Sequence, residues 1–193
     1  MVKTLLPLAI EAATEAGKLI LKYYRKDNIT SEKTDGSPLT LADQESHLII
    51  CKFLKQTDYK IVSEEGDYHH IDQNIYWLVD PLDGTKEFIK KNGEFTVNIA
   101  LIENKKPVYG LIYMPVTREI YFTKNKFSYY SRFSNKGQLL KKTKIRTKKR
   151  IKNILVLSRS HISDKKKLSE MKDFMFKKFK ANKIIQSGSS IKL

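Results

Sequence analysis

Residues 77–85 read Trp-Leu-Val-Asp-Pro-Leu-Asp-Gly-Thr, and this stretch decides how the rest of the chain is interpreted. Its apolar first half predicts a buried β-strand that ends at Asp80. Pro81 fixes φ and Gly84 permits a tight turn at that end. The carboxyl group of Asp83 should therefore lie beside that of Asp80. Two carboxylates at such a distance repel each other unless a cation lies between them.

The residue types around this turn indicate which cation would bind. Only oxygen ligands are present, with no His or Cys nearby, and such a set favours Mg²⁺ over Zn²⁺. Thr85 and the backbone N–H groups that follow the turn could hold a phosphate. The same Asp-x-x-Asp-Gly-Thr pattern also occurs as a solvated turn, so the residues alone leave both interpretations open.

A second acidic group, Glu64 and Glu65, follows a short predicted strand at 59–63. The ends of parallel or neighbouring strands lie together, so we expect Glu64 near Asp80. Glu65 is interpreted as a surface carboxylate.

Two helices open the chain, joined by a turn-rich loop. Apolar residues at helical spacing predict the first helix over 4–26. Thr40 is a good N-cap and predicts the second helix over 40–55. Asp43, three residues after Thr40, fits a capping box and is assigned to capping. Asp35 lies in the loop between the two helices.

A β-meander and a strand–helix–strand unit are expected after the second helix. The expected elements are strands at 75–79, 94–102, 108–114, 119–123 and 154–158, a helix at 164–180, and a strand at 183–186. Residues 124–152 show little periodicity, which predicts a domain boundary. The expected units are 1–135 and 150–193, with a basic connector at 136–149.

The net charge of +16 is concentrated in the last third of the 193 residues. Residues 1–123 hold 15 Lys and Arg against 18 Asp and Glu, whereas residues 124–193 hold 22 against 3. Lys outnumbers Arg by 31 to 6, although phosphate-binding surfaces favour Arg, so compositional bias is the preferred explanation. The alternative is a basic module that binds nucleic acid or an anionic membrane. Its best feature, the run 141–152, has no aromatic residue for stacking on bases.

The single cysteine, Cys51, excludes an internal disulfide and fits a reducing compartment. It lies in an apolar run, so we expect a buried structural thiol and not a nucleophile. No apolar stretch reaches the ~18 residues of a membrane span. Glu11 and Glu15 interrupt the apolar start, which argues against a signal peptide. The expected location is cytoplasmic.

Together these motifs resemble those of the inositol monophosphatase superfamily of Mg²⁺-dependent, lithium-sensitive phosphatases. The motifs that carry the resemblance are Ser-Glu-Glu at 63–65, the run at 77–88, Gly-Glu-Phe-Thr-Val-Asn-Ile-Ala-Leu-Ile at 93–102, and the segments 35–43, 157–161 and 188–192. Lys-Glu-Phe-Ile at 86–89 resembles the 3'(2'),5'-bisphosphate nucleotidase branch more than the inositol phosphatases. The resemblance extends from the first helix to the last residue.

The resemblance implies an α+β fold, a layered α/β sandwich of the inositol-monophosphatase and sugar-phosphatase type. Relatives continue beyond the Gly-Ser-Ser turn with a Trp-Asp-x-Ala-Ala-Gly segment, whose Asp completes the second metal site, and this chain has no such segment. We therefore expect a carboxy-terminally truncated form with an incomplete second α/β half and weak or no activity. The strands at 154–158 and 183–186 are expected to lack sheet neighbours.

The resemblance also implies hydrolysis of adenosine 3',5'-bisphosphate to AMP and phosphate, in support of sulfate assimilation. Two or more Mg²⁺ ions would activate the attacking water. The residues carried over are Glu64, Asp80, Asp83 and the Leu82 carbonyl as metal ligands; Asp35, Thr85 and Glu64 as catalytic residues; and Glu64, Leu82, Asp83, Gly84, Thr85, His161, Ser189 and Lys192 as substrate contacts. His161 could instead be a solvent-facing loop residue, and Ser189 a helix cap.

The expected partner is a small nucleotide, with no specific nucleic acid. The resemblance leaves open a peripheral contact with the anionic cytoplasmic face of the membrane. The alternatives are an inositol or sugar monophosphatase and the basic binding module. The oligomeric state is not indicated.

Overall fold

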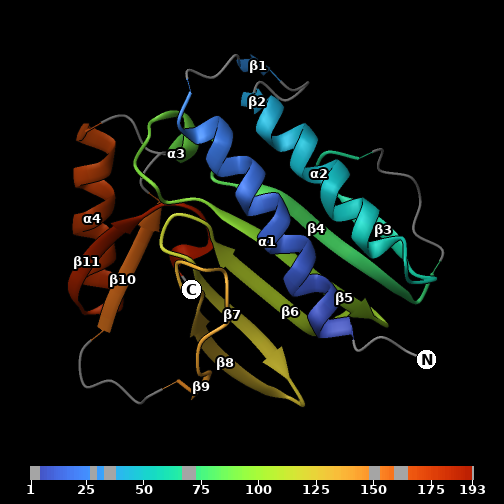
Figure 1. The fold of residues 1–193 in the computed structure, drawn as a ribbon. Coiled ribbons are helices and arrows are strands. Elements are labelled where there is room, and N and C mark those ends of the chain that lie inside the picture. Colours follow the sequence, from blue (N-terminus) through green and yellow to red (C-terminus); the bar gives the residue numbers. More distant parts are fainter. Residues whose placement is uncertain are drawn as a thin grey trace.

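The computed structural model describes residues 5–26, 30–32, 38–66, 73–147, 153–158 and 165–192. Two helices, α1 (Leu5–Tyr24) and α2 (Leu41–Leu54), lie side by side across one face of a large sheet (Figure 1). Both predicted helices are thereby confirmed. Within the described residues, no helix is both long enough and apolar enough to cross a bilayer.

The sheet has seven strands in the order β3-β4-β5-β6-β7-β8-β9. They are β3 (Lys60–Ser63), β4 (Ile75–Asp83), β5 (Thr96–Glu103), β6 (Lys106–Met114), β7 (Glu119–Lys124), β8 (Phe127–Arg132) and β9 (Thr143–Ile145). β3 pairs with β4 in parallel, and every other pair is antiparallel. The expected meander is therefore present, and two further strands extend it.

The core lies between the two helices and the sheet. Small residues on α1 let the helix approach the strands closely, and Gly17 lies directly against Tyr113 of β6. Large side chains fill the remaining space. The largest fully buried ones are Trp77, Phe88, Phe95, Ile20, Ile50 and Leu54.

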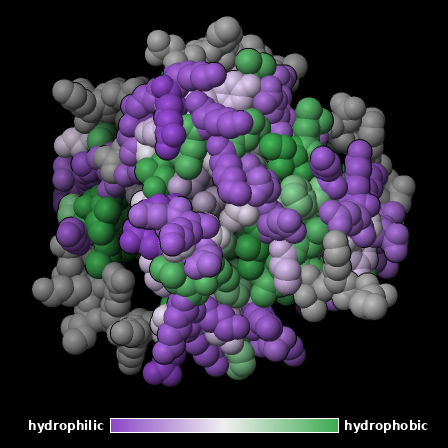
Figure 2. All heavy atoms as spheres, in the orientation of Figure 1, coloured by the Kyte–Doolittle hydropathy of each residue, from purple (hydrophilic) through white to green (hydrophobic). Residues whose placement is uncertain are grey.

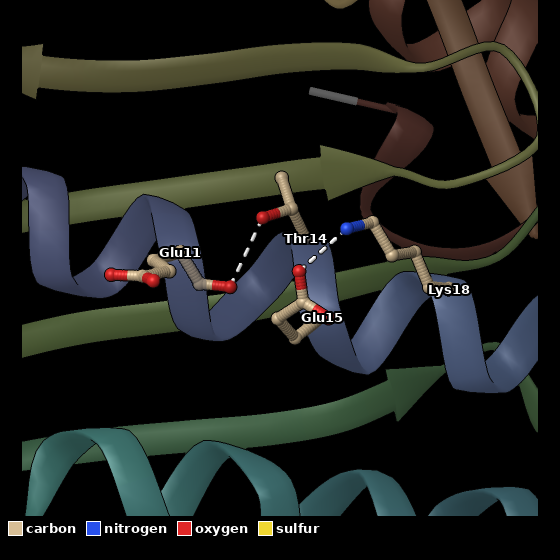
Figure 3. A network of polar contacts seen from close by, with 4 residues as sticks. All are labelled: Glu11, Thr14, Glu15 and Lys18. Atoms are coloured by element: carbon tan, nitrogen blue, oxygen red, sulfur yellow. Dashed lines mark hydrogen bonds and ion pairs between the residues drawn. The ribbon is translucent and has the colours of Figure 1, made fainter. Parts of the chain in front are cut away.

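The outer face of α1 is polar. Thr14 donates a hydrogen bond to the carbonyl of Glu11, and the Lys18 ammonium lies 2.6 Å from the Glu15 carboxylate (Figure 3). Both side chains of this ion pair are exposed, so its contribution to stability is below about 1 kcal/mol. Hydrophilic residues spread across this face, with apolar ones between them (Figure 2).

The segment expected to mark a boundary contributes β8 and β9 to the same sheet. β9 lies inside the expected connector at 136–149, so that stretch is partly sheet. A two-residue turn joins β7 to β8, with positive φ of 51° at Asn125 and 64° at Lys126. A small hairpin, β1 (Thr30–Glu32) with β2 (Pro38–Thr40), was also not expected.

The carboxy-terminal part contains β10 (Asn153–Ser158), α4 (Lys165–Phe179), β11 (Ala181–Ser187) and the short 3₁₀ helix η1 (Ser189–Lys192). β10 and β11 pair in parallel, so each has the neighbour that we expected it to lack. Val156 and Ile185 on these strands nevertheless remain 38% exposed. The pair forms a sheet of its own among the described residues.

Gly17→Ala is expected to destabilise the protein. An added Cβ would lie 2.5 Å from Tyr113 Cε1, and such overpacking costs about 1–3 kcal/mol, more than the helix gains from alanine. Urea denaturation measures the change.

Gly110→Ala is the matched control, because no atom lies within 4 Å of a Cβ added there. A Gly17→Ala variant as stable as the parent protein would show that α1 does not approach the sheet this closely.

Candidate active site

The acidic residues meet because β3 and β4 run in parallel and end together. Ser63 pairs with Val79, and the Glu64 N–H donates to the Val79 carbonyl at 3.0 Å. Glu64 and Asp80 therefore leave the two strands side by side, and their carboxyl groups share a hydrogen bond. The predicted proximity of these two residues is confirmed.

Asp80 is held among like charges in a largely desolvated position. Burial, the neighbouring charges of Glu64 and Asp83, and the hydrogen bond with Glu64 raise its pKa to about 8. The Leu82 N–H donates to the Asp80 carboxyl group and opposes this change only in part. Such a position favours a proton or a cation beside the two carboxyl groups.

The turn after Asp80 differs from the expected one. β4 continues to Asp83, with an irregular register against β5 between Asp80 and Asp83. The tight turn follows at Gly84, whose φ is +95° and which precedes the short helix α3 (Thr85–Ile89). A Cβ on Gly84 would lie 3.0 Å from the Glu94 carbonyl, so this position requires glycine.

Asp83 connects the site to η1. Its Oδ2 accepts hydrogen bonds from Ser189 Oγ at 2.7 Å, from the Ser190 N–H at 2.6 Å and from Ser190 Oγ at 2.6 Å. Asn98 also donates to the same oxygen, at 3.3 Å. In this arrangement Asp83 accepts most of its hydrogen bonds from η1.

Thr85 hydrogen-bonds a residue for which the sequence indicated only a capping role. Its Oγ1 donates to Asp43 Oδ1 at 3.0 Å and lies 3.3 Å from the Leu82 carbonyl. The other oxygen of Asp43 accepts the Thr40 N–H and hydroxyl, so the capping prediction is also confirmed. Asp43 is 1% exposed, and burial raises its pKa against these hydrogen bonds.

The carboxyl groups of Glu64 and Asp80 line a cavity of about 1340 Å³. Its lining also includes Asn98, Ser190 and Glu119. Among the described residues, no Lys, Arg or His lines the cavity. A strongly basic protein thus contains a locally acidic cavity.

The donor set fits a hard divalent cation. Glu64, Asp80 and the Leu82 carbonyl supply oxygen ligands only, and a cation would replace the proton that the first two share. In the part of the chain that the structure describes, no three or more Asp, Glu, His or Cys side chains are already arranged to hold an ion. Glu64 and Asp80 instead bond each other, and Asp83 bonds η1.

The other expected site residues are only partly placed. Ser189 opens η1 and is buried, with its hydroxyl 2.8 Å from Thr96 Oγ1. Lys192 ends η1, but its side chain lies outside the described part. Asp35 and His161 lie outside the described residues altogether.

Comparison with known proteins places the chain in one family. The model of the inositol monophosphatase family matches residues 1–193. The 3'(2'),5'-bisphosphate nucleotidase CysQ of Buchnera aphidicola (subsp. Acyrthosiphon pisum) is 39% identical over 189 residues, 94% of this chain and 67% of that protein. CysQ of Escherichia coli K12 is 46% identical over 118 residues, 58% of this chain and 48% of that protein.

Solved structures agree with this result. The crystal structure of CysQ from Bacteroides thetaiotaomicron, a bacterial member of the same family, matches with a TM-score of 0.77 and 38% identity. The match covers 99% of this chain and 75% of that one. The chain therefore spans about half to three quarters of the length of these relatives. The match over residues 1–193, the layered α+β fold and the acidic strand ends show that the chain belongs to the inositol monophosphatase family.

Proposed function

We propose that this protein is a metal-dependent phosphatase that converts adenosine 3',5'-bisphosphate to AMP and phosphate. The observation that carries the proposal is the meeting of Glu64 and Asp80 at two parallel strand ends, next to the hydrogen-bonded pair Thr85 and Asp43. The nucleotidase names of the relatives support this substrate class. Removal of a by-product of sulfate assimilation is the corresponding cellular role.

Glu64, Asp80 and the Leu82 carbonyl would hold the first Mg²⁺, and Asp80 with Asp83 the second. When bound, such ions acidify a coordinated water and neutralise the phosphate and the leaving oxygen. Asp83 would have to exchange its hydrogen bonds with Ser189 and Ser190 for this role. The turn at 82–85 would seat the scissile phosphate.

Thr85 and Asp43 would orient the attacking water. The Thr85 hydroxyl donates a hydrogen bond to Asp43, so the lone pairs of its oxygen are available to accept a hydrogen bond from water. Asp43 fixes the orientation of the Thr85 hydroxyl, because the Thr40 N–H donates to the other oxygen of Asp43 and keeps its carboxyl group in place. The resemblance implied Asp35 as a catalytic residue, and in this proposal Asp43, the hydrogen-bond partner of Thr85, has a catalytic role as well.

The alternatives have less support. An inositol or sugar phosphatase shares the fold, but the relatives of highest identity reported above are bisphosphate nucleotidases. A basic nucleic-acid module does not explain an acidic cavity without Lys or Arg among its described lining residues. The cytoplasmic location, the contact with an anionic membrane and the weak or absent turnover stay predictions.

One prediction of the proposed function concerns the ratio of the hydrolysis rates of two substrates. With Mg²⁺, phosphate release from adenosine 3',5'-bisphosphate should exceed release from inositol 1-phosphate by about tenfold or more. Asp80→Asn should lower the rate by more than about 100-fold, because even outer-shell residues of metal sites cost 10–100-fold. A coupled phosphate assay measures both.

Asp58→Asn, the same change at an exposed residue outside the site, is the control. A preference for inositol 1-phosphate, or equal rates for Asp80→Asn and the parent protein, would contradict the proposal.

A second prediction separates the Thr85 hydroxyl from the packing of its side chain. Thr85→Val should lower kcat by about 100-fold because it removes the group that orients water, whereas Thr85→Ser should stay within about threefold. Steady-state kinetics at saturating Mg²⁺ distinguishes the two. Equal losses in both variants would exclude the hydroxyl role.

The third prediction follows from the raised pKa of Asp80. Because this pKa is about 8 in the folded protein and near 3.8 when unfolded, folding favours the protonated form, and the metal-free protein loses stability as pH rises toward 8. Between about pH 7 and 8 the melting temperature in EDTA should fall by about 2–4 °C relative to Asp80→Asn.

Excess Mg²⁺ should reverse this trend, since it binds the deprotonated carboxylate and stabilises the folded state. The thermal scan is repeated with Mg²⁺ and compared with the same scan of Asp80→Asn. Parallel curves for the two proteins in EDTA would refute the assigned pKa.

A further inference from the structure

α2 presents three chemically active side chains along one face: Asp43, His47 and Cys51, spaced four residues apart. Asp43 reaches Thr85 in the candidate active site. His47, one turn later, reaches a different element, and its Nδ1 lies 2.8 Å from Ser63 Oγ, within hydrogen-bond distance.

Ser63 is the last residue of β3 and directly precedes Glu64. It is 4% exposed, so its hydroxyl is buried with His47 as its hydrogen-bond partner. The chain then turns at once, because the Gly66 N–H donates to the Ser63 carbonyl at 3.0 Å. The His47 ring also packs on the end of this turn, since a Cβ on Gly66 would lie 3.5 Å from its Cε1.

Glu64 is thus fixed from two sides. Its backbone N–H bonds β4 through the Val79 carbonyl, and the residue before it is held by α2 through His47. The Glu64 side chain is exposed and long. Its contact with Asp80 therefore depends on the position of the Glu64 backbone, from which the side chain extends. A shift of the turn would separate the two carboxyl groups.

The thiol of Cys51 is a weak alternative partner for the imidazole. Its Sγ lies 3.7 Å from both ring nitrogens, at the long end for a sulfur contact. Cys51 is partly buried and burial raises the pKa of its thiol, in keeping with a structural role. Burial also lowers the pKa of His47, so the ring is neutral at pH 7.

We propose that His47 is a positioning residue of the cation site. Its hydrogen bond to Ser63 fixes the turn that presents Glu64 to Asp80, and it thereby sets the affinity for a divalent cation. The proposal rests on the proposed function for the identity of the ligands, but cation affinity is measurable without substrate or turnover.

Two isosteric variants test the geometry. In His47→Asn the side-chain amide takes the place of Nδ1 and can still bond Ser63. In His47→Gln the amide takes the place of Nε2 and cannot. Isothermal titration with Mn²⁺ should show about tenfold weaker binding for His47→Gln and for Ser63→Ala, as expected for loss of one buried hydrogen bond, and a change within about threefold for His47→Asn.

The double variant His47→Gln with Ser63→Ala should bind no more weakly than either single variant, because all three lose the same interaction. Cys51→Ala is the control that alters the other side of the ring, and its affinity should be unchanged. Equal affinity of His47→Gln and the parent protein, or equal loss in His47→Asn and His47→Gln, would overturn the proposal.

Hydrogen exchange provides a readout that is independent of any metal. The amides of Glu64 and Gly66 should exchange faster in His47→Gln but not in His47→Asn. If the parent protein bound no Mn²⁺, the proposed metal site would fail, while this measurement would still decide the positioning role. Unchanged exchange in His47→Gln would overturn it.

Discussion

The rest of the structure depends on one constraint, the parallel pairing of β3 with β4 that brings Glu64 against Asp80. Carboxyl groups so placed are costly to ionise together, and contacts with neighbouring elements maintain this arrangement. α2 holds the turn after β3 through His47, and it holds Thr85 through Asp43. The buried core beneath, rich in aromatic side chains, keeps α2 and the strands at a fixed spacing.

The candidate site is also connected by hydrogen bonds to the last residues that the structure describes. Asp83 accepts hydrogen bonds from Ser189 and Ser190, more than a hundred residues away, and Glu94 accepts the N–H of Gly188 at 2.7 Å. These contacts join the β10–α4–β11 part to the large sheet, because η1 packs on β5. The Asp83 carboxylate therefore contributes to the packing of η1 and is also a candidate metal ligand. The two roles compete for the lone pairs of its oxygens.

The sequence predicted the elements whose apolar periodicity is strong. It also predicted Glu64 beside Asp80, because the apolar run of each strand shows where that strand ends. It did not reveal β8, since the sequence Phe-Ser-Tyr-Tyr-Ser-Arg shows no alternation of apolar and polar residues. The Asn125–Lys126 turn, with positive φ at both positions, was the available signal. The second role of Asp43 could not be predicted, because contact with Thr85 depends on how α2 packs across the sheet.

The charge distribution has a different meaning once the site is located. Net charge acts at long range and favours approach of a polyanion to a protein of +16, whereas the ionisable acids among the described residues that line the cavity are Glu64, Asp80 and Glu119. On the proposed function, these carboxylates are the local barrier to a nucleotide bisphosphate, and a cation bound between them removes it. Cation and nucleotide therefore favour each other by the same coupling free energy in both directions. The basic last third contributes attraction at a distance, and the acidic strand ends determine what can bind.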